Sequence, residues 1–156
     1  MLNRKVIIMA KDWVYRSPLF GMVVRYVGYI FSEDGTEENI TNIKTKMDEG
    51  YSIMIFPEGS RSSDGNLNRF HKGAFYLAEK LNADIQPIMI HGAGDVSPKN
   101  EMMVKDGTIN VKALPRIFAD DLKWGSDYRS RQKSISVYFK EQYKKFKDER
   151  EDADYL

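Results

Sequence analysis

The chain has 156 residues, which is long enough for one domain with a hydrophobic core. Apolar residues make up 42% and charged residues 30%, a composition that is typical of a globular protein and excludes a disordered one. The 24 basic and 23 acidic residues nearly balance, so any basic binding site must be local. The absence of cysteine excludes a disulfide framework, a thiolate nucleophile and a cysteine zinc site.

The sequence shows neither a membrane-spanning segment nor a signal peptide. No apolar run approaches the roughly 18 to 20 residues that a membrane-spanning helix needs. The start, Met1–Lys5, leads directly into a short strand-like run. We therefore expect a soluble or peripheral chain, and its start on a strand suggests a segment of a longer protein.

Apolar residues recur along the chain with the spacings of strands and helices in alternation. Short apolar runs predict strands at Val6–Ala10, Tyr29–Phe31, Tyr51–Phe56, Ile85–Ile90 and Thr108–Leu114. Helical spacing predicts helices at Pro18–Val27, Thr36–Glu49, Lys72–Leu81 and Asp127–Arg150. This alternation favours an α/β fold with a mixed, mostly parallel sheet flanked by helices. We expect one domain over residues 1–150 and a frayed tail over residues 151–156.

Two of the predicted helices carry further signals. Thr36 is expected to cap the second helix, and Gly50 is expected to end it. The last helix is predicted to place one apolar face in the core, made by Ile135, Phe139, Tyr143 and Phe146.

The stretch MIFPEGSRSSD, residues 54–64, places charges at the end of a predicted core strand. The apolar run stops at Pro57, and four chemically different residues follow it: Glu58, Gly59, Ser60 and Arg61. In an open α/β sheet, ligands bind beyond the carboxyl ends of the strands. The stretch is therefore a candidate binding site.

Several features of the loop over residues 58–72 favour an anionic ligand. Gly59 allows a tight turn that brings amide groups close to a ligand, and Arg61 supplies a planar cation suited to a phosphate or carboxylate. Serine hydroxyls add neutral donors at Ser60, Ser62 and Ser63. Lys72 lies at the expected start of the next helix, where the helix dipole also favours an anion. We predict Arg61 as the main contact and Lys72 as the second, the alternative for Lys72 being a solvated lysine.

Glu58 needs a separate explanation, because a carboxylate repels a phosphate. It fits if it pairs with Arg61 or another base, or if it accepts a hydrogen bond from a substrate hydroxyl. A ligand with a phosphate beside hydroxyls, such as a glycerol phosphate, would satisfy both charges. The alternative is an ordinary polar loop with one internal salt bridge.

The block FPEGSRS, residues 56–62, closely resembles the F-P-E-G-T-R-S block of the PlsC-like glycerophospholipid (lysophosphatidate) acyltransferase family, with Ser60 in place of the usual threonine. The likeness covers about residues 5–95 in the family's order and spacing. It includes AKDWVYRSPLFG before the block, and FHKGAFYLA and IQPIMIHG after it. The resemblance implies the glycerol-3-phosphate acyltransferase-like fold and an acyl transfer in phospholipid synthesis.

Two departures accompany this resemblance. Family members carry a block N-H-x-S-x-x-D, whose histidine is the general base and whose aspartate orients that histidine. This chain has two histidines, His71 and His91, and the fifth positions after them are Tyr76 and Val96. The family's second block usually ends in arginine, whereas Ser-Glu-Asp follows Phe31.

The resemblance implies that the glycerol phosphate of the acceptor is bound by Glu58, Gly59, Ser60, Arg61 and Lys72. It implies acyl-CoA or acyl-carrier protein as the acyl donor, a glycerol-phosphate or lysophospholipid acceptor, and no further cofactor. We expect the catalytic histidine and aspartate upstream of this chain, no catalytic residue and no metal site within it, and no activity of the chain alone. We also expect a membrane surface as a partner, no nucleic acid, and a location on the cytoplasmic side of the membrane, peripheral or as part of a membrane protein.

Other interpretations stay open. A non-catalytic module that binds lipid head groups or regulates a larger membrane protein fits the missing base, and a different phosphate-binding α/β enzyme is a third possibility. His71 and His91 are interpreted as a surface residue and a structural residue rather than as replacement bases. The aromatic stretch over residues 13–26 predicts either an interfacial membrane helix or a helix that faces the core.

Overall fold

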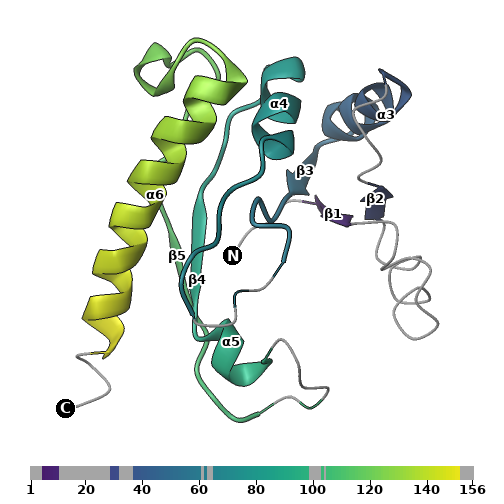
Figure 1. Cartoon of the computed structure of the whole chain (residues 1–156). Coiled ribbons are helices and arrows are strands. Elements are labelled where there is room, and N and C mark those ends of the chain that lie inside the picture. Colours follow the sequence, from purple (N-terminus) through teal and green to yellow (C-terminus); the bar gives the residue numbers. More distant parts are fainter. Residues whose placement is uncertain are drawn as a thin grey trace. The chain divides into compact units, whose positions relative to one another are not determined.

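The computed structural model describes residues 5–10, 29–31, 37–60, 62, 65–98, 103 and 105–151 (Figure 1). The chain divides into two compact units, Met1–Phe56 and Pro57–Leu156, each with its own sheet. The expectation of a single domain over residues 1–150 stays a prediction. The predicted helix Pro18–Val27, the aromatic stretch 13–26 that overlaps it and the cap Thr36 lie outside the described residues.

The first unit contains a three-stranded parallel sheet. Strand β1 (Lys5–Ala10) lies between β2 (Tyr29–Phe31) and β3 (Tyr51–Met54). Ile8 pairs with Tyr29 on one side and with Met54 on the other. Because all three strands run in the same direction, the chain must cross over between β2 and β3, and the helix α3 supplies that connection.

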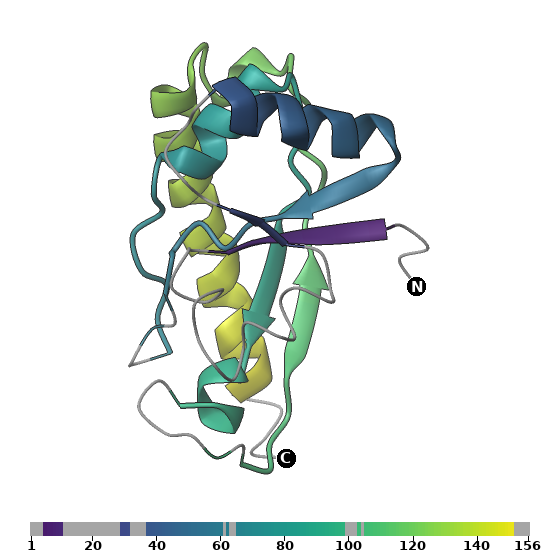
Figure 2. The same ribbon diagram turned by 90° about the vertical axis from the view of Figure 1, so that its right-hand side faces the viewer.

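Helix α3 (Glu37–Asp48) packs against β3 and buries Ile43, which is 2% exposed. Figure 2 shows the helix on one side of the strands of this unit. The helix is followed by Gly50, which has φ 85° and whose N–H donates to the carbonyl of Met47. The predicted glycine stop is confirmed, because a left-handed residue after the last turn lets the amides return to the helix carbonyls.

Strand β3 is shorter and less buried than the sequence predicted. Its pairing with β1 stops at Met54, so Ile55 and Phe56 lie outside the strand, and the predicted end at Phe56 is wrong. The four strand residues are half-buried, and Phe56 is 54% exposed. The physical reason is its place in the sheet, since β3 is an edge strand among the described strands: β1 is its partner there, and their pairing extends no further than Met54.

The second unit combines an antiparallel strand pair with two helices. Strands β4 (Ile88–His91) and β5 (Asn110–Ala113) pair with Met89 opposite Lys112. Helices α4 (Gly73–Lys80) and α6 (Tyr128–Glu151) lie within a residue or two of their predicted ranges. Figures 1 and 2 both show α6 running beside β4 and β5.

The predicted strands Ile85–Ile90 and Thr108–Leu114 are only partly confirmed. Pro87 has no amide hydrogen for a strand ladder, and the pairing is interrupted around it. Ile85 forms an isolated bridge with Ile117, and the side chain of Gln86 donates to the carbonyl of Leu114 at 2.6 Å. Two short elements were not predicted, α5 (Ala93–Val96) and the 3-10 helix η1 (Leu122–Trp124).

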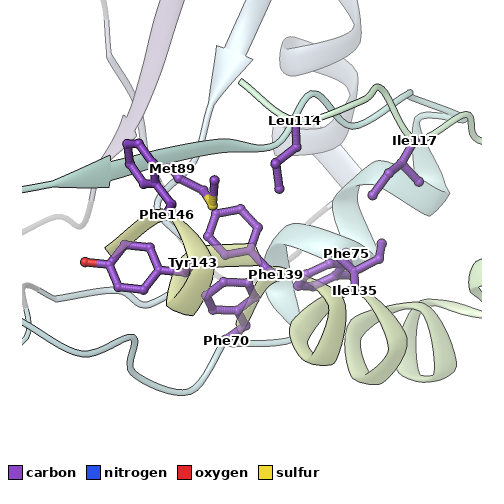
Figure 3. Packing of buried hydrophobic residues seen from close by; sticks show 9 residues of the cluster. All are labelled: Phe70, Phe75, Met89, Leu114, Ile117, Ile135, Phe139, Tyr143 and Phe146. Atoms are coloured by element: carbon purple, nitrogen blue, oxygen red, sulfur yellow. The ribbon is translucent and has the colours of Figure 1, made fainter. Parts of the chain in front are cut away.

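The core of the second unit is built on the predicted apolar face of α6 (Figure 3). Ile135 and Phe146 are 2% and 1% exposed, and the Phe139 ring meets the Phe70 ring edge-on at 5.3 Å between centroids. The buried cluster consists of Phe70, Phe75, Met89, Leu114, Ile117, Ile135, Phe139, Tyr143 and Phe146. Each such side chain contributes about 1.5–3 kcal/mol by burial, so α6 is the main support of this unit.

The predicted fold class is confirmed. Strands and helices alternate, with parallel pairs in the first unit and an antiparallel pair in the second, which gives a mixed α/β architecture. In the part of the chain that the structure describes, no helix has the length and apolar character needed to cross a membrane.

Candidate functional site

The candidate site is the loop from Pro57 to Lys72, which we name the PEGS loop after its first four residues. Two hydrogen bonds close it. The N–H of His71 donates to the carbonyl of Pro57 at 2.7 Å, and the N–H of Asn68 donates to Oε2 of Glu58 at 2.7 Å. The loop therefore returns to its starting point, and Lys72 comes directly after the residue that closes it.

Glu58 is half-buried at the beginning of the PEGS loop. Burial raises the pKa of this carboxyl group above its ordinary value, and the hydrogen bond from Asn68 opposes part of the shift. The sequence suggested a partner in Arg61, in another base or in a substrate hydroxyl. The structure shows a main-chain amide of the same loop, and this bond uses one of the two carboxylate oxygens.

Gly59 and Ser60 are exposed and follow Glu58 in the turn. Gly59 has φ 68°, which lies in the left-handed region that favours glycine. The expectation that this glycine permits a tight turn therefore has a structural basis. Arg61, the predicted main anion contact, lies outside the described residues.

Lys72 is exposed and immediately precedes helix α4. Its carbonyl accepts the first hydrogen bonds of the helix, from the amides of Phe75 and Tyr76 at 3.1 and 2.9 Å. The amides at the start of a helix and the helix dipole favour a negative charge at this end. The closing bond from His71 to Pro57 brings this cationic end next to the turn that carries Glu58.

The two histidines occupy different surroundings. His71 is exposed, and it enters the loop closure through its main-chain amide. His91 is half-buried at the end of β4, where its Nδ1 lies 3.4 Å from the hydroxyl of Tyr143. Its ring also meets the Phe146 ring edge-on, at 6.4 Å between centroids. These contacts fit the structural interpretation of His91.

Three residues that hold the PEGS loop were not identified from the sequence: Asn68, Gln132 and Tyr143. The side-chain amide of Gln132 donates to the carbonyl of Phe70 at 3.1 Å, and the hydroxyl of Tyr143 donates to the carbonyl of Gly65 at 3.1 Å. Helical spacing placed Tyr143 in the core, but no pattern in a single sequence could reveal a contact with a residue 78 positions away.

Among the described residues, no group of three or more His, Cys, Asp or Glu side chains could hold a metal ion. The polar groups assembled at the PEGS loop are a half-buried carboxylate, exposed hydroxyl and amide donors, and an exposed ammonium group at a helix start. Such a set can bind a ligand that combines a phosphate with hydroxyl groups.

Comparisons with known proteins give a consistent result. The family described as Acyltransferase matches residues 1–91. The chain is 29% identical over 115 residues to a chloroplastic 1-acyl-sn-glycerol-3-phosphate acyltransferase of Arabidopsis thaliana. The matched region covers 70% of this chain and 32% of that relative. It is 32% identical over 115 residues to a 1-acyl-sn-glycerol-3-phosphate acyltransferase of Borreliella burgdorferi, which covers 71% of this chain and 46% of that relative.

The fold is similar to the crystal structure of the 1-acyl-sn-glycerophosphate acyltransferase PlsC from Thermotoga maritima. The TM-score is 0.72 at 22% sequence identity, over 92% of this chain and 57% of the other. This chain thus spans about a third of the length of the Arabidopsis relative and just over half of the solved structure.

Proposed function

Because the chain belongs to the Acyltransferase family, and within it to the lysophosphatidate acyltransferases, we propose that its PEGS loop binds the phosphorylated glycerol acceptor of an acyl-transfer reaction. The loop's own geometry carries this proposal. Its two ends are bound together by the Glu58–Asn68 and His71–Pro57 hydrogen bonds, which brings an acid and the cationic start of α4 to one place.

Each charge of the site has a role in acceptor binding. The guanidinium of Arg61 and the ammonium of Lys72 bind the phosphate, and the hydroxyl of Ser60 and the amides around Gly59 add neutral donors. The Glu58 oxygen that is not bound to Asn68 accepts a hydrogen bond from a glycerol hydroxyl. Support comes from the exposure of Ser60 and Lys72 and from the half-buried position of Glu58.

In the proposed reaction, a hydroxyl oxygen of the acceptor attacks the carbonyl carbon of an acyl thioester, acyl-CoA or acyl-carrier protein. The C–S bond breaks, the thiol leaves, and a base takes the hydroxyl proton. No further cofactor is required. An acceptor that carries an acyl chain lies in a membrane, so we propose that the protein works at the cytoplasmic surface of one.

The base of this reaction is proposed to lie in a part of the protein outside these 156 residues. Neither His71 nor His91 is followed by an acid at the position of the family's H-x-x-x-x-D block. A positioned general base contributes about 10²–10⁴-fold to a rate. The chain by itself is therefore proposed to bind the acceptor without transferring the acyl group at a useful rate.

An acyl-transfer assay tests the proposal. Two proteins are compared, this chain and the chain extended upstream in its native gene, with sn-glycerol 3-phosphate or lysophosphatidate as acceptor and long-chain acyl-CoA or acyl-carrier protein as donor. Transfer by the extended protein alone is the expected result. If neither protein transfers an acyl group and both still bind phospholipid vesicles, the proposal is wrong, and the non-catalytic head-group-binding module replaces it.

A further inference from the structure

The C-terminal helix α6 lies beyond the residues matched by the family, yet it holds the PEGS loop at two points. Tyr143 donates to the carbonyl of Gly65, and Gln132 donates to the carbonyl of Phe70. Both acceptors are main-chain groups, so the helix holds the path of the loop whatever side chains the loop carries. The two points flank Asn68, whose amide binds Glu58.

Tyr143 differs from the other aromatic residues of the α6 core in carrying a polar group. Its side chain is 8% exposed and belongs to the buried cluster. Figure 3 shows its ring among the other rings, with the hydroxyl oxygen at the edge and directed away from them. A phenylalanine would fill the same space, so packing alone does not explain the hydroxyl.

The hydroxyl of Tyr143 has one proton, which determines the direction of its contacts with Gly65 and His91. It donates this proton to the Gly65 carbonyl at 3.1 Å, because a carbonyl can only accept. The contact with Nδ1 of His91 at 3.4 Å then requires the imidazole to carry a hydrogen on Nδ1. His91 therefore supports the orientation of the tyrosine hydroxyl from the end of β4.

Gly65 is a position where this support matters. Its φ of 69° lies in the left-handed region, and a Cβ built on it meets nothing within 4 Å. Within the described part of the loop, no atom lies close enough to pack against a side chain at this position. The tyrosine hydroxyl supplies a specific contact to the main chain at this turn.

We infer that Tyr143 is a positioning residue for acceptor binding: its hydroxyl holds Gly65 and, through the segment that leads to Asn68, keeps the Glu58 carboxylate in its place. This inference rests on the proposed function of the PEGS loop. It assigns to the C-terminal helix a part in setting acceptor affinity. A residue that only packs in the core would not need its hydroxyl for this.

The variant Tyr143→Phe removes the hydroxyl and keeps the ring. Tyr138→Phe is the matched control, because Tyr138 lies on the same helix and packs its ring against Trp124 instead. Hydrogen exchange is measured by NMR at the amides of Asn68 and His71, which form the two closing bonds, with the amides of α6 as the reference. The affinity of each protein for sn-glycerol 3-phosphate is measured by calorimetry.

The inference predicts that Tyr143→Phe speeds exchange at the two loop amides roughly two- to tenfold, the equilibrium factor of one neutral hydrogen bond. It also predicts that glycerol phosphate affinity falls by a similar factor. In Tyr138→Phe both quantities stay at the parent values. Loop exchange that is unchanged in Tyr143→Phe, or raised equally in Tyr138→Phe, overturns the inference.

The same measurements separate this inference from the proposed function. If Arg61→Ala abolishes glycerol phosphate binding while Tyr143→Phe binds as the parent does, the inference is overturned and the proposed function stands. If the parent chain binds no glycerol phosphate, the proposed function and the affinity part of the inference fail together. The exchange comparison then still decides whether Tyr143 holds the loop.

Discussion

The Oε2 atom of Glu58 accepts a hydrogen bond of 2.7 Å from the main-chain amide of Asn68, ten residues further along the chain. This contact gives a structural reason for an acid in a loop that we propose binds an anion. The carboxylate braces the loop with one oxygen, which leaves its charge beside the turn of Gly59 and Ser60. Support of the loop and contact with a substrate hydroxyl are compatible roles for a group with two acceptor oxygens.

Removing the Glu58 acceptor should destabilise the loop. Glu58→Ala loses the bond to Asn68, whereas Glu58→Gln keeps a side-chain oxygen that can accept it. We expect the free energy of unfolding of Glu58→Ala to lie about 1 kcal/mol below that of Glu58→Gln, as measured by urea denaturation. Equal values for the two variants would show that the bond adds no stability.

The raised pKa of Glu58 predicts a pH dependence of stability with a definite sign. Burial disfavours the charged form, so the folded state binds more protons than the unfolded state between the ordinary and the raised pKa. The contribution of Glu58 to the free energy of unfolding therefore falls as the pH rises through this window. Because glutamine does not titrate, the free energy of unfolding of Glu58→Gln should rise relative to that of the parent as the pH passes through this window. Above the window, the difference between the two proteins should stay constant. If Glu58→Gln instead loses stability relative to the parent as the pH rises, the raised pKa assigned to Glu58 is wrong.

Gln132 is a buried polar residue whose loss should be costly. Its side chain is 8% exposed and donates to the carbonyl of Phe70. Gln132→Ala leaves that carbonyl without this donor, so we expect the free energy of unfolding to fall by about 1–3 kcal/mol. Lys133→Ala, at the exposed neighbouring position, should change it by less than about 0.5 kcal/mol. Thermal and urea denaturation of both variants test this prediction. Equal losses of stability would show that the hydrogen bond from Gln132 to Phe70 is not the cause.

Phe146 tests the role of α6 as the support of the second unit. The ring is 1% exposed, and Phe146→Ala should lower the free energy of unfolding by about 3–5 kcal/mol. Val137, on the same helix, is 59% exposed, and Val137→Ala should change it by less than about 0.5 kcal/mol. Similar losses in both variants, measured by urea denaturation, would contradict the assigned core.

Elements with strong periodicity could be predicted from the sequence. The apolar face of α6 and the glycine stop after α3 are found where spacing and turn chemistry placed them. The ends of the strands were predicted less accurately, because they depend on pairing with neighbouring strands. Strand β3 stops where its pairing with β1 stops, and strand β4 begins only after Pro87.

The residue types of the candidate site could be read from the sequence, but the contacts that hold the site together could not. The residue types of the FPEGSRS block indicated a candidate anion site, and its resemblance to the F-P-E-G-T-R-S block indicated the family. The brace from Asn68 and the contacts of Gln132 and Tyr143 with the loop could not be predicted. These hydrogen bonds connect residues that are far apart in the sequence, and each involves a main-chain group. Because every residue has the same main-chain groups, a single sequence carries no signal for such a contact.

The most direct test of the central claim is a calorimetric titration of the chain with sn-glycerol 3-phosphate, repeated on Arg61→Ala, Lys72→Ala and Arg69→Ala. Arg69 is an exposed arginine of the same loop and serves as the matched control for charge. The account predicts that the parent binds, that Arg61→Ala weakens binding at least tenfold, equivalent to about 1.4 kcal/mol, that Lys72→Ala weakens it less, and that Arg69→Ala binds almost as the parent does. Binding that survives Arg61→Ala, or that falls equally in Arg69→Ala, would contradict a specific acceptor site in the PEGS loop.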